Sequence, residues 1–428
     1  MKNFIVFYIF IIVVLSGYAQ NFEQNLDKAY KFFELYNTEC KKENAQLWNI
    51  SYCSNLAIID NENRILFSLE PIIIEAKEYF QDGIYCYVYP ETMMFSSGVN
   101  KFGDKIYALL NFDDKDRMLE TAFHEMTHKF QEDSNVNLSY NNKHIDTKYA
   151  RAYIRLEAKA LFNAFTKDNK RDFIIDALFF RQKRQNMFID AKENEDAFEL
   201  IEGLAQFSGM IIAYKDSAVN LLINDIQNLI KGYFDARTFG YYTGDAYSFL
   251  NNDSLHWNYN IYDVGCITAI TKKIYNITDI DLQSQDEDNL FKQYDFSSIF
   301  KEEEKRENAM IAKNKEKLKI LENNPKLIIQ NLNNYTLHLR VSPYIINDTI
   351  TYYSTIGIED KFGYIYTEND CFIIEDKIIF ILPNDLNIEQ MNNNFCDNNF
   401  CIKLNKNYAI EKQDSNYILS FEKLKNAP

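Results

Sequence analysis

A His-Glu-Met-Thr-His segment at residues 124–128 constrains this chain more than any other feature. His124 and His128 are four residues apart, so in a helix both imidazoles project from one face, one turn apart. A single metal ion can then bind both rings. Apolar residues recur around the segment at helical spacing and predict a helix over 115–133: Leu119, Ala122, Phe123, Met126 and Phe130.

Glu125 completes the HExxH pattern. It is rotated by about 100° from His124 around the helix axis, so it lies beside a metal ion rather than on it. A carboxylate in that place can take a proton from water at the metal. The alternative is a partly buried helix whose two histidines are satisfied by neighbouring groups.

A catalytic zinc site needs a third protein ligand besides its one open position. Residues 129–138 contain neither His nor Gly, so we expect a carboxylate from further along the chain. Glu202 is the first candidate, because Gly203 follows it and lets its helix approach another helix closely. Glu202 also shares a predicted helix face with Glu195 and Glu199. Such a concentration of acid is costly unless the carboxylates are solvated or face a cation.

Glu157 is the second candidate for the third ligand. It lies after His128 on a helix predicted over 146–167. Its alternative role is an ion pair with Arg155 or Arg181, or support behind the ligands. The residues alone therefore leave Glu202 and Glu157 both open.

The N-terminus has the pattern of a signal peptide. Lys2 precedes an apolar run from Phe4 to Leu15, and small residues follow at Ser16, Gly17 and Ala19, where a signal peptidase cuts. We expect residues 1–19 to be removed, leaving a secreted or periplasmic chain with no membrane span. The alternative is an uncleaved anchor.

The chain is acidic, with a formal net charge of -16. This charge disfavours binding to nucleic acid and to anionic membranes, because both repel it. The seven cysteines show no Cys-x-x-Cys metal pattern. In an oxidising compartment, Cys40–Cys53 and Cys396–Cys401 are close enough in sequence for local disulfides. The alternative is that most cysteines are small buried apolar residues.

The order of residue types predicts an α+β fold. Strand-like runs before residue 113 predict a small, mainly antiparallel sheet, with a helix over 70–80. Helical patterns follow to about 275, and residues 20–300 are expected to form one catalytic domain. The expected strands are 56–59, 65–69, 84–89 and 106–112, and the later helices are 146–167, 171–191, 193–214, 216–233 and 260–275.

The rest of the chain differs in composition. Residues 301–325 are rich in Lys and Glu and predict a solvated connector helix. Residues 326–428 hold β-branched and aromatic runs separated by Asn, Asp and Gly, which predict a small all-β domain. Nothing in this domain identifies its partner.

The two central motifs resemble those of the gluzincins, the thermolysin-like clan in which two His and one Glu bind zinc. HEMTH followed by ELIEGLAQF is similar to the HExxH and W-L-x-E-G-x-A segments of the clan's zinc aminopeptidases. The resemblance implies one zinc ion held by His124, His128 and Glu202, with Glu125 as general base and proton shuttle. It also implies that Gln206 orients a ligating His, as in some members.

The resemblance extends to the surroundings of these motifs. RLEAKAL at 155–161 and YTGDAY at 242–247 resemble an uncharacterised group of secreted bacterial HExxH proteins. In the clan an edge strand precedes the active-site helix and pairs with extended substrate, a role that falls here to Ile106–Phe112.

A peptidase of this kind also needs a donor for the developing oxyanion. Gluzincins use a His or Tyr after the third ligand, and we expect Tyr242 or Tyr247 to serve, from a loop containing Gly240 and Gly244. The alternative is that these tyrosines only pack. The other candidates in this region are Arg237, Tyr241 and His256.

The chain departs from the clan's aminopeptidases in two respects. The gap over 129–201 is longer than theirs, and Gly98-Val99-Asn100 lacks the Glu of their Gly-x-Met-Glu-Asn signature. Aminopeptidase activity is therefore not expected. The sequence predicts a secreted zinc metallopeptidase acting on a peptide or protein substrate. The alternatives are a catalytically silent binding protein of the same fold, and a zinc hydrolase of a non-peptide amide or ester.

Overall fold

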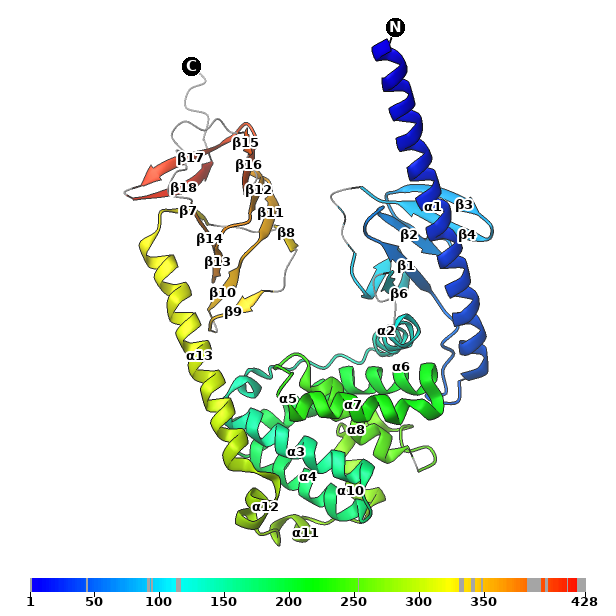
Figure 1. Cartoon of the computed structure of the whole chain (residues 1–428), viewed down its shortest axis with the longest axis vertical. Helices are drawn as coiled ribbons and strands as arrows, with labels where there is room; N and C mark the ends of the chain where they lie inside the picture. The colour runs from blue at the N-terminus through cyan, green and yellow to red at the C-terminus, as the bar shows by residue number, and fades with distance from the viewer. Residues whose placement is uncertain are drawn as a thin grey trace. The chain divides into compact units, whose positions relative to one another are not determined.

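The computed structural model describes residues 2–43, 45–90, 93, 95–112, 117–252, 254–330, 335–339, 343–347, 349–382, 394–396, 399–413 and 415–421. Strands and helices occur in separate runs along the chain, so the predicted α+β class is confirmed (Figure 1). The chain divides into two compact units, residues 1–307 and 308–428. The boundary lies inside helix α13 (Phe296–Asn323), which contains most of the stretch expected to be a connector.

The first unit begins with helix α1 (Lys2–Glu43), followed by a sheet of six strands among the described residues (Figure 1). The strand order is β3-β4-β2-β1-β6-β5, and only the pair β1–β6 is parallel. Asp82 and Gly83 join β3 to β4 with positive φ at both residues, as a tight hairpin turn requires. The strands are β1 (Leu56–Asp60), β2 (Ile65–Ser68), β3 (Lys77–Gln81), β4 (Ile84–Val88), β5 (Gly98–Phe102) and β6 (Lys105–Asn111).

Two predictions for this sheet are wrong. The helix predicted over 70–80 is absent from those residues, where β3 forms an edge strand with all five residues exposed. The predicted edge strand Ile106–Phe112 corresponds to β6, which lies inside the sheet between β1 and β5. The edge on this side is β5, a short polar run whose only pairing partner in the described sheet is β6.

Strand β1 has apolar side chains on both faces of the sheet, because successive side chains point to opposite faces and its first four residues are all apolar. Leu56 and Ile58 face the core shared with α1 and the helices, whereas Ala57 and Ile59 face a second apolar cluster around the chain segment 72–95. Burial on both faces explains why β1 reads as a continuous apolar run.

Helices make up the rest of the first unit. Of those whose side chains the structure describes, none is both long enough and apolar enough to span a bilayer. The helices are α2 (Met118–Asp133), α3 (Lys148–Thr166), α4 (Lys170–Gln185), α5 (Ala191–Phe198), α6 (Leu204–Tyr214), α7 (Ala218–Ile230), α8 (Phe239–Asn251), α9 (Ile261–Val264), α10 (Ile267–Ile274), α11 (Asp279–Gln283) and α12 (Glu287–Tyr294).

Helix α2 is held from two sides. Phe123 stacks on Tyr36 of α1 and meets Tyr52 edge to face. The Tyr52 hydroxyl lies 3.0 Å from Thr127 Oγ1, one residue before His128. A disulfide between Cys40 and Cys53 joins the segment that carries Tyr52 to α1, as predicted.

The second unit is a β-sandwich. Within its described part, the two sheets have the orders β17-β18-β7-β14-β13-β10-β9 and β15-β16-β12-β11-β8. Leu327 and Phe380 of one sheet and Ile358 and Ile365 of the other share one core, which is the packing expected of two facing sheets. The strands are β7 (Lys326–Ile329), β8 (Thr336–Leu339), β9 (Tyr344–Ile345), β10 (Ile350–Tyr353), β11 (Ile356–Asp360), β12 (Gly363–Thr367), β13 (Cys371–Ile374), β14 (Lys377–Ile381), β15 (Asn394–Cys396), β16 (Phe400–Leu404), β17 (Tyr408–Gln413) and β18 (Asn416–Phe421).

The predicted disulfide Cys396–Cys401 joins β15 to β16. The three remaining cysteines, Cys86, Cys266 and Cys371, are buried thiols. Four of the seven cysteines thus form the two predicted disulfides, and the alternative that most cysteines only serve as small buried apolar residues is wrong.

We expect the double substitution Cys40→Ser/Cys53→Ser to lower the free energy of unfolding of the first unit by about 3 kcal/mol, because the open chain gains entropy. Both tryptophans, Trp48 and Trp257, lie in this unit, so tryptophan fluorescence during urea unfolding reports it separately. Cys396→Ser/Cys401→Ser should leave that transition unchanged. An unaltered midpoint in the first variant would contradict this account of the disulfide.

Candidate metal centre

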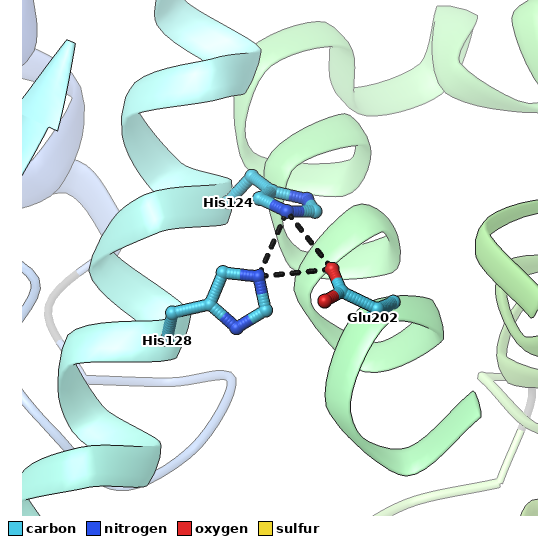
Figure 2. Close-up of side chains that lie close together, drawn as sticks. All are labelled: His124, His128 and Glu202. Atoms are coloured by element: carbon cyan, nitrogen blue, oxygen red, sulfur yellow. Dashed lines mark hydrogen bonds and ion pairs between the residues drawn. The ribbon is translucent and has the colours of Figure 1, made fainter. Parts of the chain in front are cut away.

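Three side chains from distant parts of the sequence meet between α2 and the turn that precedes α6 (Figure 2). His124 and His128 project from one face of α2 and point toward the carboxylate of Glu202. Their Nε2 atoms are 3.0 Å apart, and Glu202 Oε2 lies 3.1 Å from His128 Nε2 and 3.6 Å from His124 Nε2. The ligand atoms of all three residues lie within 4.8 Å of one another, so one metal ion could bind them together.

The chemistry of this cluster suits a cation. Burial raises the pKa of Glu202, but its hydrogen bonds with His124 and His128 outweigh burial and hold that pKa well below its usual range. Burial lowers the pKa of His128, but the hydrogen bond and the charge of Glu202 raise it overall. Two imidazole nitrogens and one carboxylate oxygen are a donor set that catalytic zinc takes. The residues therefore fit zinc.

A single turn of π-helix, Glu199–Gly203, carries Glu202 between α5 and α6. The N–H of Leu204, the residue just after this turn, donates to the carbonyl oxygen of Glu199, five residues back. In an α-helix the acceptor would be the carbonyl four residues back. Glu199 and Glu202, which were expected on one face, consequently meet different partners: Glu199 contacts Arg181 and Glu202 contacts the histidines. Such π-turns are rare and are frequent at functional sites.

Glycines let the π-turn lie directly against α8. A Cβ atom on Gly203 would lie 2.6 Å from Gly244 Cα and 2.9 Å from the Gly240 carbonyl oxygen. The close helix approach expected at Gly203 is therefore confirmed. Gly240 and Gly244, however, belong to a helix rather than to the predicted loop, where their lack of side chains serves packing.

The other acidic residues of this stretch face arginines. Both oxygens of Glu199 lie 2.7 Å from Arg181, in a bidentate ion pair. Glu195 lies 2.8 Å from Arg184 and 2.9 Å from His144 Nε2. The cation expected opposite the acidic face is therefore an arginine guanidinium for Glu195 and Glu199. Glu202 alone among the three faces the histidines.

Glu157, the alternative third ligand, belongs to the same buried network. Its carboxylate lies 2.5 Å from Arg184 and 3.4 Å from Arg181, and it accepts a hydrogen bond of 2.8 Å from the Tyr247 hydroxyl. The pair with Arg181 was one of the roles expected of it, whereas Arg155 contacts Glu303. With these partners, Glu157 lies outside the His124–His128–Glu202 cluster.

The structure does not bring Tyr242 or Tyr247 to the metal cluster. Tyr247 is fully buried and its hydroxyl is bonded to Glu157. Tyr242 is half-buried, and burial together with the charge of Asp225 raises its pKa. Both lie on α8, where successive side chains are about 100° apart, so neighbours on the helix point to different places.

Tyr241 is the residue of α8 that reaches the cluster. Its ring stacks on His124 with the centroids 5.6 Å apart and the planes 5° apart. Burial and its interactions with Glu202 raise the pKa of Tyr241 far above the usual range. Tyr140, on the segment after α2, donates a long hydrogen bond of 3.4 Å to Glu202 Oε1. Tyr140 lies in a polar stretch without periodicity, so no local pattern indicates its role.

Glu125 and Gln206 were assigned roles beside the ligands. Glu125 is mostly buried, and its charge opposes the effect of burial on the pKa of His128, which places the carboxylate near the cluster. Gln206 does not contact a histidine; it donates to Glu120 Oε1 at 2.7 Å. Gln131 contacts His128 instead, with its Oε1 2.8 Å from Nδ1. Its position three residues after His128 on a helix is the signal that could have found it.

Comparison of the chain with known protein families, with curated proteins and with solved structures found no match.

We expect Glu202→Gln to lose most of its bound zinc, because it removes the one anionic ligand of the cluster. Glu157→Gln is the matched control, with the same change of charge at the rejected ligand. It should keep about one zinc per chain yet lower the free energy of unfolding by about 3 kcal/mol, since two buried arginines lose a partner. Metal content by mass spectrometry and urea unfolding check both variants. Zinc retained in Glu202→Gln and lost in Glu157→Gln would make Glu157, not Glu202, the third ligand.

Proposed function

We propose that the chain is a zinc-dependent metallopeptidase. The observation that carries the proposal is the convergence of His124 Nε2, His128 Nε2 and a Glu202 oxygen, with Glu125 next to them on α2. A carboxylate beside the ligands can take a proton from water at the metal, a role that a metal which only stabilises a fold does not need.

The proposed roles of the chain's residues follow from their chemistry. When bound, zinc supplies Lewis-acid chemistry, which lowers the pKa of water and polarises a carbonyl group. His124, His128 and Glu202 would hold it. Glu125 would accept a proton from the attacking water and return it to the leaving amine. The burial of Glu125 favours this transfer by keeping other water from its carboxylate.

Tyr241 supports the proposal as the oxyanion donor. Because its pKa lies far above neutrality, its hydroxyl keeps its proton and can donate to a developing negative charge. Tyr140 has its pKa raised to about 12 by burial and by Glu202, so it also stays protonated. Its ring is exposed, so a substrate that approaches the cluster could contact it.

Strand β5 is the proposed place for the substrate backbone. The sequence predicts that β6 pairs with the substrate, but β5 is the edge strand beyond β6 and it also contacts α2. We therefore assign the pairing to β5. An extended peptide can add to such an edge through main-chain hydrogen bonds. This mode of binding distinguishes a peptide from a small amide or ester, which has no strand to pair.

A secreted or periplasmic location is part of the proposal. It rests on the predicted signal peptide and is supported by the two disulfides, which form in oxidising compartments.

We expect Glu125→Gln to bind zinc as the wild type does and to lose at least 100-fold in kcat, because proton transfer is removed while the ligands stay. Hydrolysis of a fluorogenic peptide library, with metal content measured on the same samples, checks this. Cleavage at the wild-type rate would rule out the mechanism. If the wild type holds zinc and cleaves only small amides or esters, a non-peptide hydrolase is indicated.

We expect Tyr241→Phe to lower kcat about 100-fold with little change in KM, because an oxyanion donor acts on the transition state. Tyr242→Phe is the control next to it on α8, where removal of the hydroxyl should leave kcat within about twofold. Steady-state kinetics on the best peptide of the library measure both variants. Equal kcat values for the two would remove Tyr241 from the mechanism.

A further inference from the structure

One buried side chain, Gln131, contacts both elements that supply the candidate ligands. It lies on α2, three residues after His128, and is 3% exposed. Its Oε1 is 2.8 Å from His128 Nδ1. Its Nε2 donates to the carbonyl oxygens of Leu200 and Ile201, at 3.2 and 3.1 Å, which belong to the π-turn just before Glu202. A single amide thus bridges the histidine helix and the glutamate turn.

The acceptors fix which way this amide points. A backbone carbonyl only accepts hydrogen bonds, so the NH₂ group of Gln131 must face Leu200 and Ile201. Its oxygen must then face His128, whose Nδ1 is therefore the donor. In the neutral imidazole this leaves Nε2 with its lone pair, and Nε2 is the atom aimed at His124 and Glu202. Gln131 thereby selects the tautomer that can bind a metal.

The amide has a fourth hydrogen-bond partner. Its Nε2 also donates to the Tyr262 hydroxyl oxygen, at 3.0 Å. Burial raises the pKa of Tyr262 to about 12, so this hydroxyl is neutral and its oxygen accepts. The Tyr262 ring lies 6.5 Å from that of Trp48, in the apolar core. The position of Gln131 is therefore set by the protein and not by the metal.

We propose that Gln131 is a positioning residue for the metal centre: it fixes the ring of His128 and holds the π-turn so that Glu202 meets both histidines. This inference rests on the proposed zinc site. Outer partners of this kind change metal affinity by about 10- to 100-fold when they are removed. Gln131 differs from the ligands in that its effect reaches two of them at once.

The test is the zinc Kd of the full chain, measured by competition with a chromophoric chelator, together with the visible spectrum of the cobalt(II)-substituted protein. Gln131→Met removes all four hydrogen bonds at similar volume, and we expect its zinc Kd to rise 10- to 100-fold with a shifted cobalt spectrum. Gln206→Met is the matched control, because Gln206 is also a glutamine one turn past a ligand but bonds Glu120. It should leave the Kd within about threefold and the spectrum unchanged.

A second variant keeps the test decisive if Gln131→Met does not fold, as judged by circular dichroism. Gln131→Asn keeps the amide, but its side chain is one methylene shorter and cannot bridge His128 to the carbonyl oxygens of Leu200 and Ile201. Its zinc Kd should rise about 10-fold. A Kd and cobalt spectrum equal to those of the wild type in the folded variant would overturn the inference while leaving the zinc site intact. If the wild type itself binds no zinc, the proposed function and this inference both fall.

Discussion

Two buried arginines of α4, Arg181 and Arg184, lie among carboxylates from α3, α5 and the π-turn. Buried ions add little net stability, but each needs its partners in place because an unpaired charge in the interior is expensive. The helices that supply these partners therefore have few alternative arrangements. The constraint extends to α8, because Thr243 and Tyr247 donate to the same carboxylates.

The ion pairs of Arg181 and Arg184 restrict the position of Glu202, although Glu202 itself contacts neither arginine. Glu199 is held by Arg181, and Glu202 follows three residues later on the same π-turn. Three kinds of contact thus hold the π-turn: the ion pair of Glu199, the close packing against the glycines of α8, and the hydrogen bonds from Gln131. Contacts within the protein thus place the candidate third ligand, so the proposed metal would meet a site that is already formed.

The sequence was most informative where chemistry is local. His124, Glu125 and His128 lie within two turns of one helix, so their spacing in sequence is enough to predict the relative directions of their side chains. Glu202 was identified from a local motif as well, although its face was assigned from an α-helical period that the π-turn breaks. Tyr241 was passed over for Tyr242 and Tyr247 because the choice among them depends on the rotation of α8 against the π-turn, which only packing determines.

The same division between local and long-range effects explains the errors in the fold. The sequence predicts the strands with strong apolar runs, but it predicts a helix where β3 forms, because pairing with β4 rather than its own pattern makes β3 a strand. The sequence predicts β6 as an edge strand, because no local signal indicates that the polar run Gly98–Phe102 pairs with it. Two glycines predict a loop where helix α8 forms; in the structure Gly244 faces the backbone of the π-turn and Gly240 faces the ring of Phe198.

The contact between Gly203 and Gly244 has a consequence for the descent of this chain. Two residues without side chains face each other across a gap too narrow for a methyl group, so neither position can drift alone. Lineages that keep the carboxylate before Gly203 should keep both glycines together, while the surrounding apolar residues exchange freely. The two positions therefore form one steric constraint that links the π-turn to α8 across about 40 residues of sequence.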